Sequence, residues 1–220
     1  MTLLRPHLLA LALWGTAAAA AEPAAERLPP ASGAYVGVRA GFALPLGRFE
    51  ADAERRALSD VYDFGWPVQL DLGWRFSPAL RAGLYLGYTR LATRTFCPAG
   101  LECRASSLRV GVGGEYHLAT HRRLHGWLGA GLGYEGSEVR IRGRGVDVET
   151  RYRGFEWLGA SVGADYRLLP RLTLGPTLTW TFARYGSRES RLGTGSGTEQ
   201  LEHPALHCWA LLGARAQWAF

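Results

Sequence analysis

Apolar and polar residues alternate along most of the chain beyond residue 34. In one stretch, for example, Val68, Leu70 and Leu72 are separated from one another by single polar residues. Such alternation, sustained over about 8 to 12 residues, predicts a strand with one apolar face. The sequence predicts eight of these strands, which are Val36–Phe42, Trp66–Phe76, Ala82–Tyr88, Leu108–Tyr116, Leu128–Tyr134, Leu158–Tyr166, Leu172–Phe182 and Leu206–Phe220.

The face opposite the apolar one is rich in glycine and in charged residues. Glycine weakens an exposed strand, but it leaves room for charged neighbours inside a narrow barrel. A soluble barrel would turn its bulky apolar face inward. We therefore expect the apolar side chains to face lipid and the polar ones to face a packed lumen, as in transmembrane barrels.

Aromatic residues on the apolar face concentrate at the strand ends, whereas aliphatic and small residues occupy the middles. Two aromatic girdles on either side of an apolar band are typical of barrels anchored at both membrane interfaces. One predicted girdle contains Trp74, Phe76, Tyr116, Tyr166, Trp218 and Phe220, and the other contains Phe42, Trp66, Tyr88, Tyr134, Trp180 and Phe182.

The connections alternate between short and long. The short ones are Ser77–Ala79, Ala119–Arg123 and Leu169–Arg171, and the long, largely polar ones are Leu44–Asp63, Leu91–Ser107, Gly136–Gly154 and Arg184–Pro204. Short periplasmic turns and longer outside loops are typical of outer-membrane barrels, so both termini are expected in the periplasm. The predicted fold class is all-β, an eight-stranded antiparallel up-and-down transmembrane β-barrel. Pro176 interrupts the seventh strand and cannot donate to a ladder, so a bulge or distorted pairing is expected there.

The chain is predicted to be exported. Residues 1–21 carry one Arg, an apolar run and a row of alanines, which is the arrangement of a secretory signal peptide; a cytoplasmic N-terminal helix is the alternative. Residues 22–33 are then a Pro/Ala-rich periplasmic linker, and residues 34–220 form the barrel. No later segment offers ~20 consecutive apolar residues, so no transmembrane helix is predicted.

Composition fits an all-β exported chain. The sequence contains 29 glycines, 8 tryptophans and 9 tyrosines but one methionine, and all 25 basic residues are arginine. We attribute the lack of lysine to the codon bias of a GC-rich genome. The net charge of +6 is modest, and nucleic acid is not an expected partner of an exported chain.

The signal peptide, the eight amphipathic segments and the terminal run Leu212–Phe220 together resemble the OmpA/OmpX-like family of small outer-membrane barrels. The resemblance implies a monomer in the bacterial outer membrane, in contact with its lipid and with lipopolysaccharide, and inserted by the barrel assembly machinery. A C-terminal aromatic residue after alternating apolar ones resembles the insertion signal of such proteins. That role therefore falls to Trp218 and Phe220. The resemblance says little about activity.

Seven charged residues fall on the predicted lumen face: Arg39, Asp71, Arg81, Arg109, Glu115, Asp165 and Arg215. Buried charges need partners, so opposed arginines and carboxylates are expected to fill the barrel as a structural plug. A gated conduit is the alternative, although eight strands enclose barely enough space for side chains.

Cys97 and Cys103 lie close together in one outside loop. In an exported protein this spacing predicts a disulfide that pins the loop, and a metal site there would lack further ligands. Cys208 lies on the lipid-facing parity and is expected to stay unpaired.

Alternation continues past the membrane in the segment Val139–Glu149. Glycines in its middle permit a tight turn, so the segment predicts a projecting hairpin with arginines opposite carboxylates. The free edge of such a hairpin would be able to add a partner strand. A merely solvated loop is favoured over such partner binding.

Histidines suggest a lipid A-modifying acyl hydrolase as one class of function; they include His117, His121, His125, His203 and His207. Such a site needs a nucleophile, a base and an orienting group in contact, and no nucleophile motif is present. No catalytic residue, cofactor or metal is therefore expected. The predicted function is a non-enzymatic barrel with an envelope role and outside loops available for binding. The alternatives are an OmpW-type conduit for small hydrophobic molecules and, behind it, the acyl hydrolase.

Overall fold

The computed structural model describes residues 32–50, 57–93, 97–143, 145–193 and 195–220. Its elements are β1 (Gly33–Gly47), α1 (Leu58–Val61), β2 (Phe64–Arg75), β3 (Leu80–Ala92), β4 (Glu102–His117), β5 (Leu124–Gly143), β6 (Val146–Leu169), β7 (Leu172–Leu192), β8 (Gly195–Gln200) and β9 (Leu206–Ala219). The predicted signal peptide and nearly all of the predicted linker lie outside the described residues. None of the described helices is long and apolar enough to cross a membrane.

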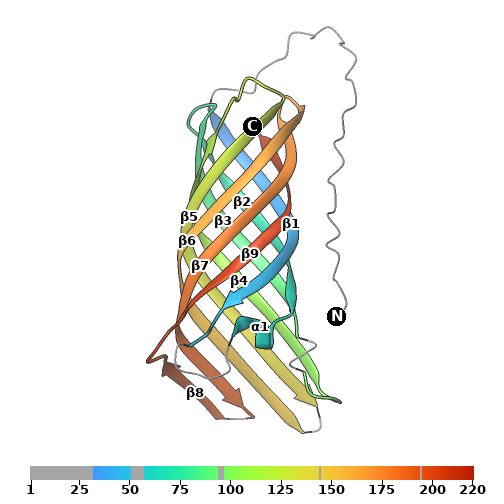
Figure 1. The fold of residues 1–220 in the computed structure, drawn as a ribbon, viewed down its shortest axis with the longest axis vertical. Coiled ribbons are helices and arrows are strands. Elements are labelled where there is room, and N and C mark those ends of the chain that lie inside the picture. The colour runs from blue at the N-terminus through green and yellow to red at the C-terminus, as the bar shows by residue number, and fades with distance from the viewer. Residues whose placement is uncertain (1–31, 51–56, 94–96, 144, 194) are drawn as a thin grey trace, which may run out of the picture.

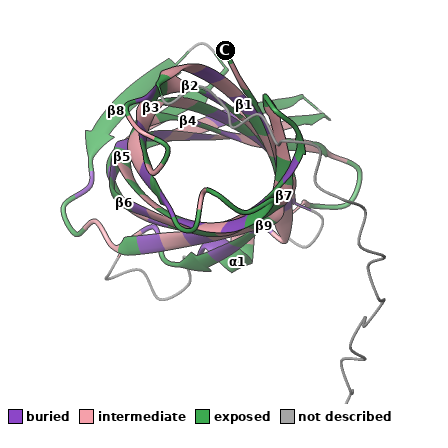
Figure 2. Ribbon diagram, turned by 90° about the horizontal axis from the view of Figure 1, so that it is seen from above, coloured by how far each residue is buried: buried purple, intermediate pink, exposed green. Residues whose placement is uncertain are grey.

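Eight of the described strands close into a ring (Figures 1 and 2). Each strand pairs antiparallel with its neighbours in the order β1, β2, β3, β4, β5, β6, β7 and β9, and β9 pairs back with β1. β8 pairs only with β7 and lies beyond the ring, at the same end as α1 (Figure 1). The predicted eight-stranded up-and-down barrel is confirmed, with β9 as its eighth strand.

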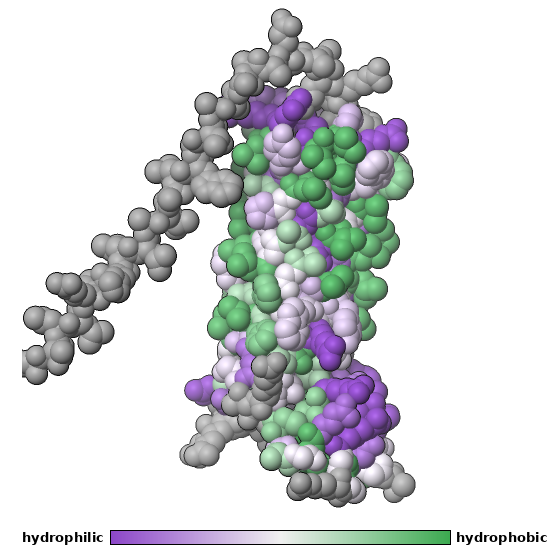
Figure 3. Space-filling model, turned by 90° about the vertical axis from the view of Figure 1, so that its right-hand side faces the viewer, coloured by the Kyte–Doolittle hydropathy of each residue, from purple (hydrophilic) through white to green (hydrophobic). Residues whose placement is uncertain are grey.

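The two faces of the wall differ as the alternation requires. Across strands β1 to β4, one row of paired residues is apolar and exposed on the outside, and it consists of Val38, Leu70, Leu86 and Val110. The next row points inward, and it consists of Arg39, Gln69, Gly87 and Arg109. Figure 3 shows the result on one side of the molecule, where hydrophobic residues cover the barrel wall and hydrophilic ones gather towards its ends.

Glycines of the wall make room for aromatic rings as well as for charges. A Cβ added at Gly111 would lie 2.4 Å from the Tyr85 ring, and one added at Gly163 would lie 2.5 Å from the Trp127 ring. Distances this short leave no space for a side chain, so glycine at these inward positions allows each ring to lie over the neighbouring strand, where Tyr85 is paired with Gly111 and Trp127 with Gly163. The sequence predicted only the room for charged neighbours.

The strands run well beyond the predicted barrel at the end that carries the long connections. β5 and β6 form the predicted hairpin, in which Arg140 pairs with Glu149, and Arg142 lies 3.3 Å from Asp147. The Arg140 guanidinium holds the pKa of Glu149 below its usual range. Neither edge of this hairpin is free, because β4 pairs with β5 and β6 pairs with β7. The expected free edge was therefore wrong for the hairpin. Among the described strands, β8 pairs only with β7, so its other edge is unpaired, and its residues are all exposed.

Pro176 does not produce a bulge. Its register with β9 is regular, and the register with β6 is the same on both sides of the proline. Near the proline, pairing with β6 is interrupted only between Thr177 and Leu174. Of the two predicted effects of Pro176, a bulge or distorted pairing, only distorted pairing occurs, and it affects the side of β7 that faces β6. Bulges lie elsewhere in β6, including one between Glu156 and Leu158 that turns both Trp157 and Leu158 outward.

A small hydrophobic core closes the end of the barrel that carries the long connections. Leu58 and Tyr62, at the two ends of α1, are completely buried together with Phe49 from beyond the end of β1. Their neighbours come from several wall strands, and the core contains Ala43, Leu91, Ala105, Val139, Tyr185, Leu201 and Trp209. The connection Leu44–Asp63, predicted as a polar outside loop, therefore includes a cap on the barrel.

Candidate functional site

A continuous network of charges crosses the middle of the lumen. Arg39 donates to Asp71 at 2.6 Å and to Glu115 at 2.6 Å. Arg215 donates to the same Glu115 oxygen at 2.7 Å and to Asp165 at 2.6 Å. The carboxylates come from three different strands, so these two arginines tie together β1, β2, β4, β6 and β9.

An aromatic ring supports the network from one side. The Arg215 guanidinium lies 3.6 Å and that of Arg39 5.3 Å from the centre of the Trp127 ring. Cations over an aromatic face are stabilised, more strongly when they are shielded from water. Trp127 is itself almost fully buried. The ring and the carboxylates together offset the cost of placing arginine inside the barrel.

The other two predicted lumen arginines have separate partners. Arg109 forms a two-pronged pair with Glu156, with N–O distances of 2.8 and 2.7 Å, and Arg81 donates to Gln217. All seven residues predicted for the lumen face therefore point into it, five of them in one network and two in separate contacts. The sequence analysis did not predict Glu156 as a lumen residue, because the bulge beside it reverses which alternate residues of β6 face inward.

A second polar cluster, centred on Glu135, lies beneath the hydrophobic cap. The fully buried Glu135 accepts from Tyr185 Oη at 2.7 Å, from Trp209 Nε1 at 2.8 Å and from Ser107 Oγ at 3.3 Å. His207 Nε2 lies 3.3 Å from its other oxygen. Strand β5 runs past the predicted end of the fifth segment at Tyr134, so continuing the alternation by one residue would have placed Glu135 inside.

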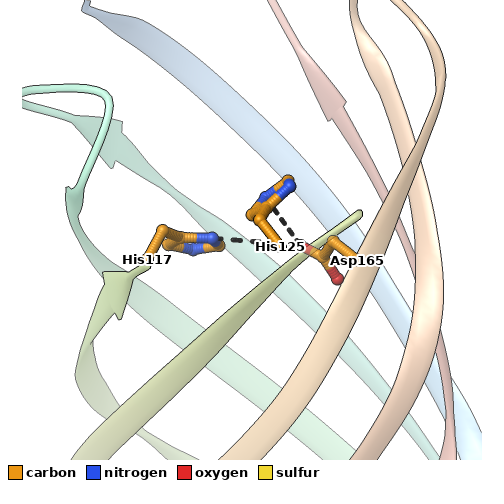
Figure 4. A group of neighbouring side chains, drawn as sticks. All are labelled: His117, His125 and Asp165. Carbon is orange, nitrogen blue, oxygen red and sulfur yellow. Dashed lines mark ion pairs between the residues drawn. The ribbon is translucent and has the colours of Figure 1, made fainter. Parts of the chain in front are cut away.

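At the opposite end of the lumen, two histidines face one carboxylate (Figure 4). His117 closes β4 and His125 lies at the start of β5, on either side of a short turn. Asp165 Oδ2 lies 4.0 Å from His117 Nδ1 and 3.9 Å from His125 Nε2. His117 also places Nε2 3.1 Å from Glu115, so it joins this group to the central network.

Side chains leave a small cavity beside the central network. The cavity beside the central network has a volume of about 50 Å³, and its lining includes Tyr35, Arg39, Tyr85 and Glu156. A cavity of this size holds a few water molecules at most.

Histidine and hydroxyl groups do not assemble into a hydrolytic triad in the described chain. His207 faces Glu135, but the hydroxyls nearby contact Glu135 or each other, as Ser137 and Tyr62 do at 2.6 Å. His121 is exposed in its turn. Ser196, seven residues before His203 in the sequence, is exposed on β8.

The remaining predicted residues lie outside the lumen. Cys97 and Cys103 form the expected disulfide, and Cys208 is free. Trp218 and Phe220 are both exposed on the outer face at the C-terminal end. Of the twelve residues predicted for the two girdles, all but Phe182 are prominently exposed.

No protein-family model and no curated protein matches this chain. Among solved structures, a major outer membrane protein from Thermus thermophilus is similar with a TM-score of 0.56 and 14% identity, over 86% of this chain and 99% of that one. The outer membrane protein OprG from Pseudomonas aeruginosa is similar with a TM-score of 0.51 and 12% identity, over 89% of this chain and 100% of that one. The fold is that of the small outer-membrane β-barrels. For these barrels, identities this low establish a common architecture and no common activity.

Proposed function

We propose that this chain is an integral outer-membrane barrel with a closed lumen, a non-enzymatic role in the envelope and a surface for binding at its long-loop end. The observation that carries the proposal is the lumen itself. Each of its two central arginines is paired with two carboxylates, and a buried hydrophobic cap lies above them. Buried ion pairs that join strands of the wall to one another favour a single packed arrangement over an open channel.

The exposed apolar wall supports placement in a lipid bilayer. Large apolar side chains such as Leu84 and Leu212, each 61% exposed, would be unfavourable in contact with water. Contact with outer-membrane lipid and lipopolysaccharide follows from this placement. The short turns and the C-terminus then face the periplasm, and the cap, the disulfide-pinned loop and β8 face outward.

The alternatives are less well supported. A conduit for small hydrophobic molecules needs a continuous passage, whereas the central lumen cavity measures about 50 Å³. An acyl hydrolase needs a hydroxyl within reach of a histidine, and His207 is sealed under the cap with a carboxylate as its neighbour.

Single-channel recording in planar lipid bilayers tests the closed lumen. The protein is refolded, its folding is verified by heat-modifiable migration on a gel, and a porin serves as the positive control. The proposal predicts no discrete conductance steps in the parent protein. It also predicts that Arg215→Ala, which leaves Glu115 and Asp165 with fewer partners, introduces steps or unstable openings. Reproducible steps in the parent protein at low voltage would contradict the closed lumen.

A further inference from the structure

In the group of His117, His125 and Asp165, the Nδ1 atoms of both histidines are buried without a hydrogen-bond partner. Glu115 is held by two arginines and is therefore an ionised acceptor. His117 Nε2, 3.1 Å from Glu115, must then carry the ring proton. In the neutral ring this leaves a lone pair on Nδ1, and that atom is buried with no hydrogen-bond partner.

The atom that this lone pair faces is also an acceptor. Asp165 accepts two hydrogen bonds from the Arg215 guanidinium, at 2.9 and 2.6 Å, so it too is ionised. His117 Nδ1 and Asp165 Oδ2 are 4.0 Å apart, which is too far for a direct hydrogen bond and close enough for a single bridging atom. His125 Nε2 lies 3.9 Å from the same oxygen.

We propose that His117, His125 and Asp165 bind a divalent transition-metal ion of the zinc class at the short-turn end of the lumen. The three ligand atoms all lie within 4.8 Å of one another. Metal–ligand lengths of about 2.0–2.2 Å require neighbouring ligands to be roughly 3.0–3.5 Å apart. Neighbouring ligand atoms would therefore need to move closer together by roughly 0.5–1.5 Å to complete the site.

The surroundings match those of a metal site. A ligating histidine commonly donates its second ring N–H to a carboxylate, as His117 does to Glu115, and ligating carboxylates are themselves hydrogen-bonded, as Asp165 is to Arg215. The His117 ring also stacks on Trp127, with ring centres 6.2 Å apart, which limits its rotation.

The choice of metal follows from the ligands and their neighbours. Two imidazole nitrogens favour zinc, cobalt, nickel or copper over magnesium or calcium, which prefer oxygen. Arg81 and Arg215 both interact electrostatically with Asp165, and their repulsion of a cation should make binding weaker than at a four-ligand structural zinc site. Because His117 is the last residue of β4 and His125 the second of β5, an ion would reach the group from the adjacent rim.

Cobalt titration tests this inference on untagged, refolded protein. Co²⁺ binding is followed by visible absorption, and Zn²⁺ is then added as a competitor. The proposal predicts one Co²⁺ per barrel, displaced by Zn²⁺, and a loss of affinity of at least about tenfold in His117→Ala and in His125→Ala. His121→Ala is the matched control, since this exposed histidine lies in the same turn and should bind as the parent protein does.

Folding of each variant is checked by heat-modifiable migration before titration. If His117→Ala does not fold, His125→Gln and His117→Gln take its place, since glutamine is similar in size to histidine and places a polar amide where the imidazole was. Absence of cobalt uptake by the folded parent protein would overturn the proposal and would indicate that water bridges the three groups. Uptake that is equal in the parent and in the folded histidine variants would overturn it as well. Neither result depends on whether the barrel conducts ions.

Discussion

The strongest energetic prediction concerns the pair between Arg109 and Glu156. The two N–O contacts measure 2.8 and 2.7 Å, and the side chains are only 7% and 1% exposed. Glu156→Gln keeps the size of the side chain and removes its charge. Arg109 then remains charged and buried without a carboxylate, and breaking a buried pair in this way costs about 3–5 kcal/mol.

Two comparison variants separate charge from packing. In Glu102→Gln the same chemical change is made at an exposed pair, where Arg104 and Glu102 lie 2.6 Å apart and are 78% and 61% exposed. Loss of such a surface pair costs about 0–1 kcal/mol. A double variant, Arg109→Met with Glu156→Met, removes both buried charges and should recover most of the stability lost in Glu156→Gln.

Equilibrium unfolding by urea, with the barrel in lipid vesicles and tryptophan fluorescence as the signal, gives the free energy of unfolding for each variant. The expected order of stability is the parent protein and Glu102→Gln together, then the double variant, then Glu156→Gln well below. A free energy for Glu156→Gln within about 1 kcal/mol of the Glu102→Gln value would refute the claim that the lumen pair is buried and specific.

Three further predictions concern the periphery of the barrel. Cys97 and Cys103 should be oxidised in the mature protein, so mass spectrometry that finds both thiols free without reductant would count against the pinned loop. Deletion of Phe220 should lower the yield of assembled barrel far more than Phe220→Tyr does, and equal yields would remove the insertion role. Arg140 lowers the pKa of Glu149, so this ion pair stabilises the hairpin fully above the ordinary glutamate pKa of about 4.3 and loses its effect as the pH falls through the lowered value. Spin labels placed across the hairpin should become more mobile only on such acidification. Unchanged mobility would argue against the pair.

The architecture was predictable because one rule governs every strand of a barrel. The period of two fixed which side chains face outward, as in the row through Leu70 and Leu86, and it also fixed the inward position of Arg39 and Arg109. The alternating lengths of the connections then distinguished the two ends of the barrel. Neither inference requires knowledge of contacts between distant residues.

Features that break this rule could not be predicted. The bulge beside Glu156 moves it into the lumen against the parity of its strand. The cap depends on Leu58 and Tyr62 packing against several strands, and a short helix inside a long connection shows no period that would reveal this. The inward position of His117 and His125 was predictable from the sequence, since both stand at the alternate positions of their strands that face the lumen. Their approach to Asp165, however, depends on the pairing of β4, β5 and β6.

The central claim, that the apolar face of the barrel is in contact with lipid, is tested most directly by neighbouring cysteines in β2. In a Cys208→Ser background, Leu70→Cys and Gln69→Cys are each labelled with a fluorophore, and the barrel is reconstituted with lipids that carry a quencher in their acyl chains. Leu70 is on the exposed outer face, whereas Gln69 donates to Asp71 at 2.7 Å inside the lumen. The label at position 70 should be quenched strongly and the label at position 69 weakly. Quenching at neither position, with the barrel folded, would contradict the membrane placement on which the account depends.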